Sequence, residues 1–88
     1  MIINLQQFLH LPVHTESGTK LGTVYDLEID VDSHTILRYL VRPNFLSVKN
    51  FLVQRNQIKE IKATEIIVYD SEVQNFLPQA ASDLALGE

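Results

Sequence analysis

Residues 21–31 alternate between the two kinds of side chain that a half-buried strand needs. Their odd positions are mostly large and apolar, whereas the acidic residues Asp26, Glu28 and Asp30 fall on even positions. Successive side chains of a strand point to opposite faces, so this period of two places the apolar residues on one face and the carboxylates on the other. The chain is therefore expected to build a sheet with one dry face and one wet face.

The segments on either side of this strand predict two hairpins. Residues 11–14 include Pro12, which lacks an amide donor and belongs at a sheet edge or at the start of a strand. The turn-forming residues 16–19 connect this piece to the alternating strand. The polar turn 32–34 then leads into a second β-rich run at 35–41.

The second β-rich run carries apolar side chains on both of its predicted faces. By parity these are Ile36 and Leu40 on one face, and Leu37, Tyr39 and Val41 on the other. A strand that is apolar on both sides is expected to be covered on both sides. A barrel with a covering element or a second subunit would provide that cover.

Three further β-rich segments follow, at 51–53, 57–61 and 66–69. They bring the expected total to five or six short strands, which suits a small closed or nearly closed β-barrel. We therefore predict an all-β fold in which residues 1–70 form one barrel domain.

The C-terminal tail, residues 71–88, differs from the barrel in its pattern. Val73, Phe76 and Leu77 are spaced for one face of a short helix that Pro78 would end. We expect a helical or partly ordered tail that docks through these three side chains onto the barrel or onto a second subunit.

Composition excludes several classes of function. The 88 residues include 7 Lys and Arg against 11 Asp and Glu, a formal charge of -4 that disfavours nonspecific binding to phosphate backbones. The absence of cysteine removes disulfides, thiolate catalysis and cysteine-ligated metals, and it fits a reducing cytoplasm. Residues 1–7 have no basic region and precede no long apolar run, so we expect no direct membrane insertion.

Candidate chemical sites have simpler explanations. His10 and His14 flank Pro12, and an extended chain would hold them roughly 13 Å apart, too far to share one ion. The acidic residues of 26–32 occupy alternate positions, where solvated charges normally lie, although a bound cation stays open. We therefore predict no catalytic residues, no metal site and no cofactor.

One mixed cluster is a candidate interaction surface: Arg38, Tyr39, Arg42, Phe45 and Leu46. Basic and aromatic side chains together can pair and stack with RNA, and they also occur on ordinary solvated strands. The two apolar residues at 45 and 46 follow a proline in a connection where polar residues are usual. They are expected either to cap the barrel or to contact a partner.

The order of elements resembles the PRC-barrel family, the small barrel of photosynthetic reaction-centre H subunits and of ribosome-maturation factor RimM. The match rests on the motif G-x-x-L-G-x-V-x-D at 18–26, followed by the β-rich segments 37–41, 51–53 and 66–69. In this motif Gly18 can form the turn, and Gly22 permits another strand or side chain to approach closely.

The resemblance implies a binding role rather than an enzyme. We expect a non-enzymatic protein-interaction or adaptor module, homodimeric and cytoplasmic, that holds a protein partner still to be identified. The alternative is an RNA-processing or ribosome-maturation factor that contacts ribosomal protein or RNA. Dimerisation would cover apolar surface and protect strand edges in a domain of this size.

Overall fold

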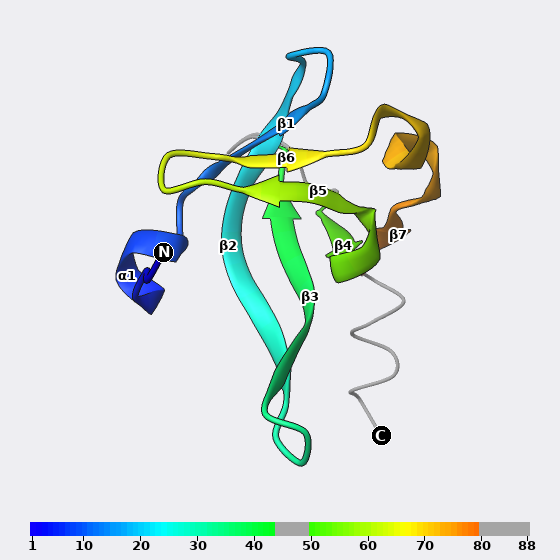
Figure 1. The fold of residues 1–88 in the computed structure, drawn as a ribbon. Helices are drawn as coiled ribbons and strands as arrows, with labels where there is room; N and C mark the ends of the chain where they lie inside the picture. Colours follow the sequence, from blue (N-terminus) through cyan, green and yellow to red (C-terminus); the bar gives the residue numbers. More distant parts are fainter. Residues whose placement is uncertain (44–49, 80–88) are drawn as a thin grey trace.

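The fold is a single curled sheet that forms a half-barrel, seen in a computed structural model that describes residues 1–43 and 50–79 (Figure 1). Across the described residues the sheet has seven strands, in the order β5-β6-β1-β2-β3-β4-β7. The strands are β1 (Pro12–Thr15), β2 (Lys20–Asp30), β3 (Thr35–Arg42), β4 (Phe51–Gln54), β5 (Ile58–Ile61), β6 (Ile66–Val68) and β7 (Leu77–Pro78). The helices are short: α1 (Leu5–Phe8) and the 3-10 helices η1 (Arg55–Gln57) and η2 (Asp70–Asn75). The predicted all-β fold is confirmed.

Both predicted hairpins are present. β2 pairs antiparallel with β1 on one side and with β3 on the other. Pro12 opens β1, which lies inside the sheet between β2 and the parallel strand β6. Of the two places predicted for the proline, the structure therefore shows the start of a strand.

A β-bulge in β3 corrects the predicted faces of that strand. Arg38 pairs with Glu28 whereas Ile36 pairs with Ile29, so Leu37 is an extra residue on β3. An extra residue reverses the alternation of side chains on its far side. Ile36 therefore lies on the same side as Tyr39, not with Leu40 as parity predicted, and the two line one groove.

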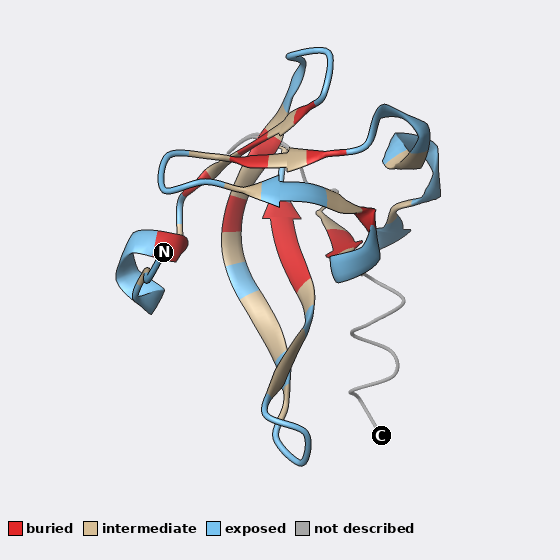
Figure 2. Ribbon diagram, viewed as in Figure 1, coloured by how far each residue is buried: buried red, intermediate tan, exposed pale blue. Residues whose placement is uncertain are grey.

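The core fills the concave side of the half-barrel. It consists of buried residues from five strands, from α1 and from the connection between α1 and β1: Phe8, Leu11, Val13, Val24, Tyr39, Val41, Val53, Ile66 and Val68. Figure 2 colours the ribbon by burial and shows the buried stretches of these strands. Burial of each large apolar side chain contributes roughly 1.5–3 kcal/mol. Cover on both sides of β3 is confirmed for residues 39–41, all of which are buried.

The short helix α1 is attached to this core by its last residue. The Asn4 side chain accepts a hydrogen bond from the backbone N–H of Gln7 (2.8 Å), and the Asn4 N–H donates to the Gln7 side chain (3.0 Å). This capping box satisfies donors that a helix start leaves unpaired. The ring of Phe8 then packs against Tyr39, with 5.4 Å between the ring centroids.

The C-terminal segment returns to the sheet. A short 3-10 helix, η2, is present there and contains Val73, but it ends at Asn75 rather than at Pro78 as predicted. Phe76 and Leu77 therefore do not share a helix face with Val73, and residues 76–78 are extended. Leu77 pairs with Leu52 of β4. The ring of Phe76 stacks on Phe51 at 5.1 Å and 9°. Residues 71–78 are thus built onto the barrel, whereas the predicted tail beyond residue 79 lies outside the described residues.

Candidate functional site

The most distinctive feature of the surface is the end of the β2–β3 hairpin, which extends beyond the rest of the sheet (Figure 1). We call residues 27–37 the hairpin arm. In the described chain β1 pairs with β2 only as far as Thr23, and β4 pairs with β3 only from Arg38 onward. At the tip, the carboxylate of Asp30 accepts hydrogen bonds from the N–H groups of Asp32 (3.0 Å) and Ser33 (3.4 Å). The turn is therefore ordered locally by a side chain, as the polar turn residues predicted.

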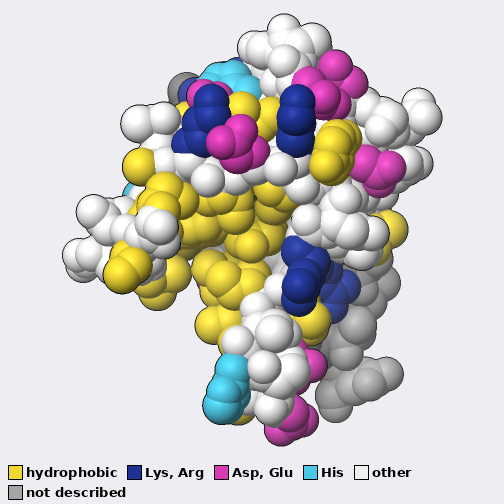
Figure 3. All heavy atoms as spheres, viewed as in Figure 1, with side chains coloured by type: hydrophobic (Ala, Val, Ile, Leu, Met, Phe, Trp, Pro, Cys, Tyr) yellow, Lys and Arg dark blue, Asp and Glu magenta, His cyan; other side chains and the backbone are white. Residues whose placement is uncertain are grey.

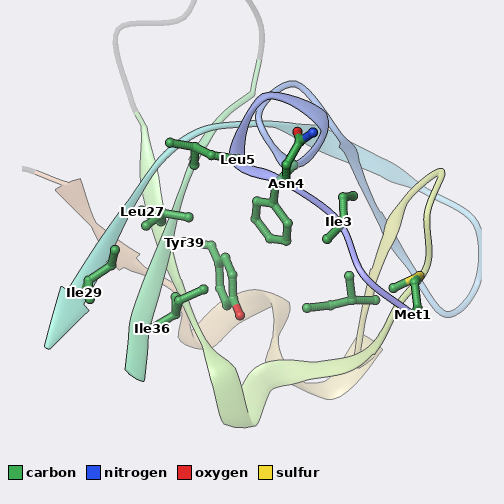
Figure 4. Close-up of a pocket in the computed structure, with 10 residues that line it drawn as sticks. Met1, Ile3, Asn4, Leu5, Leu27, Ile29, Ile36 and Tyr39 are labelled. Carbon is green, nitrogen blue, oxygen red and sulfur yellow. The ribbon is translucent and has the colours of Figure 1, made fainter. Parts of the chain in front are cut away.

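A groove of about 480 Å³ lies between this arm, α1 and the end of β5. We call it the apolar groove; its walls are Met1, Ile3, Asn4, Leu5, Phe8, Leu27, Ile29, Ile36, Tyr39 and Ile61. None of these side chains carries a charge. Figure 3 shows the hydrophobic side chains gathered in this hollow, and Figure 4 shows the arm residues and the N-terminal residues lining opposite sides of it.

Several groove residues are much more exposed than large apolar side chains usually are. The exposed fractions are 78% for Met1, 58% for Leu5 and 56% for Ile29. Two apolar residues that adjoin these segments in the sequence are also exposed, Ile2 at 98% and Val31 at 76%. Scattered apolar residues are ordinary on protein surfaces, but a contiguous apolar patch marks a place where another molecule binds.

Tyr39 brings a titratable phenol to the groove. Burial raises the pKa of its phenol above the ordinary 10.0, and the nearby guanidinium of Arg55 partly opposes this by favouring the phenolate. The phenol is therefore neutral at physiological pH and can donate a hydrogen bond. It supplies the groove with a polar contact without adding charge.

The predicted interaction surface is divided by the structure. Tyr39 faces the apolar groove, whereas Arg38 lines a separate hollow of about 250 Å³ with Leu37 and Gln54. The guanidinium of Arg38 is paired with Glu28, at 2.6 Å from Nε to Oε1. That of Arg42 lies over the ring of Tyr25, 4.7 Å from its centroid. Both arginines thus make contacts within the chain, and Phe45 and Leu46 lie outside the described residues.

Comparison with known families bears on this arrangement directly. A family model described as "PRC-barrel domain" matches residues 2–74, which include α1, the arm and strands β1 to β6. The chain belongs to the PRC-barrel family. A search of the curated proteins found no match. Apart from Met1, the residues that line the apolar groove therefore lie within the region that the family model covers.

The side chains predicted as tail contacts take different positions on this PRC-barrel. Phe76 is half-buried against Phe51, whereas Val73 is 36% exposed and Leu77 is 41% exposed. A polar cluster closes the same end of the sheet: the Asn50 amide donates to the Gln79 side chain at 2.9 Å, and the Tyr25 hydroxyl also donates to it. Besides the pairing of β7 with β4, docking of this segment therefore rests on one aromatic stack and one polar cluster.

The acidic and histidine residues of the PRC-barrel have structural contacts. Glu28 pairs with Arg38, and Asp26 accepts a hydrogen bond from the next backbone N–H at 2.8 Å. His14 contacts Glu65 at 3.0 Å from Nδ1 to Oε1, and His10 lies in a turn with φ 77°. Within residues 1–43 and 50–79, no three His, Cys, Asp or Glu side chains are grouped to hold a metal ion. In the same residues, no helix is long and apolar enough to cross a membrane.

The apolar groove was missed by the sequence analysis, apart from Tyr39. Its walls come from the N-terminal residues, the hairpin arm and Ile61, which are far apart in the sequence. One available signal was the apolar series Met1, Ile3 and Leu5 at the start of the chain. Another was the continuation of large apolar residues to the very end of the strand predicted at 21–31.

Proposed function

We propose that this PRC-barrel is a non-enzymatic interaction module whose apolar groove binds another protein chain. The observation that carries the proposal is the exposure of Leu5 and Ile29 in a groove whose side chains carry no charge. Water in contact with these side chains would be released on binding, with a gain of about 25 cal/mol for each Å² of apolar surface covered. A protein segment with apolar side chains is the partner that this surface suits.

The two arginines predicted to contact RNA support that alternative less than the sequence suggested. Arg38 is held by Glu28, and Arg42 lies over Tyr25. Binding a phosphate would require these contacts to be broken or shared, which reduces the net gain. The interaction role therefore has the stronger physical support, and the apolar groove is where we place it.

A site-specific photocrosslinker tests the proposal. We would replace Ile29, 56% exposed on the groove side of the arm, with benzoylphenylalanine, and make the same change at Leu37 as a matched control. Leu37 is 40% exposed on the same arm but lines the other hollow. In the native cells, position 29 is expected to give a discrete protein crosslink, and position 37 is expected to give none. Adding Leu5→Glu should abolish the crosslink from position 29. Equal crosslinking from the two positions would contradict a specific groove.

A further inference from the structure

We propose that the chain bound in the apolar groove is a second copy of this protein. In the dimer that we infer, a two-fold axis relates the two protomers, and each hairpin arm packs across the groove of the other. This inference rests on the proposed function, because it requires that the groove binds protein. It adds the identity of the partner and the direction in which the partner lies.

One face of the molecule carries both an apolar ridge and an apolar groove, the two parts that such an interface needs. A two-fold interface uses the same surface on both subunits, so that surface must be complementary to itself. Ile29 belongs to the wall of the groove and is also 56% exposed on the arm that borders it. Val31, nearer the tip, is 76% exposed. The arm is the apolar ridge, and the groove beside it is the apolar hollow that such a ridge would fill.

The arm is long enough to act as the ridge, and it lacks support of its own. At 3.3 Å per residue, the four steps from Leu27 to Val31 span roughly 13 Å, so the arm offers a ridge several residues long to a groove of about 480 Å³. A two-stranded ribbon is marginally stable when it stands alone. In the described chain, no third strand pairs with β2 on the tip side of Thr23, apart from β3, or with β3 on the tip side of Arg38, apart from β2. A second protomer would supply the missing layer.

Electrostatics also allow two copies to meet at this surface. Each copy has a formal charge of -4, so two copies repel unless the facing surfaces avoid like charges. No side chain of the groove walls carries a charge, which meets that condition. Side chains of opposite sign are available at the two ends of the groove. Asp32 is exposed in the turn at the arm's tip, and Lys62 is exposed next to the groove residue Ile61.

Two-fold symmetry brings those ends together. The arm and β5 lie at opposite ends of the groove, with acidic side chains at the tip of the arm and basic ones, beside acidic ones, above the groove (Figure 3). When two arms cross in opposite directions, the tip of each reaches the β5 end of the other protomer. Asp32 of one protomer then faces Lys62 of its partner, twice in the dimer.

Sedimentation equilibrium of the full chain, from about 1 μM to about 500 μM, tests the dimer. Ile29→Glu places a charge in the apolar interface and is expected to raise the dimer dissociation constant at least about 30-fold, the effect of losing a central contact. Leu37→Glu on the other side of the arm is expected to change it less than about threefold. A monomeric wild-type chain at the highest concentration, or equal effects of the two substitutions, would overturn the inference. Circular dichroism checks that both variants are folded.

Charge exchange tests the direction of the arms. Asp32→Lys and Lys62→Asp should each raise the dimer dissociation constant about two- to fivefold, the range of exposed ion pairs. The double variant should return to within about twofold of the wild type, because the pair is restored with its signs reversed. Losses that simply multiply in the double variant would overturn the crossed arrangement.

The same experiments separate this inference from the proposed function. A chain that is monomeric at about 500 μM, while Ile29 crosslinks to a different protein, overturns the second copy and leaves the groove as a binding site. A dimer that Ile29→Glu does not weaken, with no crosslink from position 29, overturns both. A dimer that Ile29→Glu disrupts, with position 29 crosslinked to another copy, supports both.

Discussion

Replacing Gly22 with alanine should destabilise this domain far more than the same change at Gly18, and the structure gives the reason. Gly22 lies in β2 where the chain passes the end of β3. A Cβ atom there would lie 2.8 Å from both the carbonyl carbon of Arg42 and the Cα of Pro43, and closer still to the Arg42 oxygen. Real Cβ atoms essentially never approach other atoms within 3.0 Å, and here the neighbours are backbone, which cannot rotate away.

The cost can be worked out from two contributions. Forcing a methyl group into packed backbone costs about 1–3 kcal/mol, and holding a non-glycine residue at φ 155° adds about 1 kcal/mol or more. We expect a loss of about 3 kcal/mol for Gly22→Ala. At Gly18, φ is 98° and no atom lies within 4 Å of the added Cβ, so only the backbone strain of about 1 kcal/mol remains.

Urea unfolding followed by circular dichroism measures the difference. A domain of 88 residues has a total free energy of unfolding of about 4–13 kcal/mol, so Gly22→Ala removes a large part of it. In thermal unfolding, 3 kcal/mol corresponds to a fall in Tm of about 12–24 °C. If Gly22→Ala lowers the free energy of unfolding no more than Gly18→Ala does, the close approach of β2 to the end of β3 does not require glycine at position 22.

Three further predictions follow from single contacts. The raised pKa of Tyr39 means that the folded chain keeps the phenol proton to higher pH than the unfolded chain, so the free energy of unfolding should fall as pH rises above 10.0. Urea titrations across that pH range should show a smaller fall for Tyr39→Phe. An unchanged pH dependence in this variant would contradict the burial effect. A double-mutant cycle with Glu28→Gln and Arg38→Met should give a coupling free energy of about 0.5–1 kcal/mol, which should be smaller in 1 M salt. A coupling of zero would show that the 2.6 Å ion pair adds no stability. Phe76→Ala should cost about 2 kcal/mol through the lost aromatic stack, against less than about 0.5 kcal/mol for the exposed Val73→Ala, and equal losses would argue against docking by the stack.

Local chemistry explains why much of the fold was predictable from the sequence. The alternation of residues 21–31, the turn residues around Gly18 and the polar residues 32–34 each depend on near neighbours in the chain, and each forms the element predicted. The close approach predicted at Gly22 is also present. A period of two and a turn require only short-range sterics and backbone hydrogen bonds, so they can be identified without knowledge of the rest of the molecule.

The predicted interaction residues show where that local reasoning ends. Arg38 and Tyr39 are adjacent in sequence, yet one pairs with Glu28 and the other faces the apolar groove. Parity alone also placed Ile36 with Leu40, because it could not include the extra residue at Leu37. A bulge depends on how two strands pair, and the residue type at position 37 does not indicate one.

Taken by itself, the sequence determined β1 to β6, the two hairpins, the glycine of the crossing and the resemblance to the PRC-barrel family, because these depend on patterns within short segments. It did not predict β7, because Val73, Phe76 and Leu77 have the spacing of a helix face. The tertiary structure alone decided that the N-terminal residues, the hairpin arm and the end of β5 would meet around one apolar groove. Burial is a property of surfaces brought together from distant parts of a chain. Whether an isoleucine such as Ile29 is buried in the core or left exposed therefore depends on how the whole sheet curls.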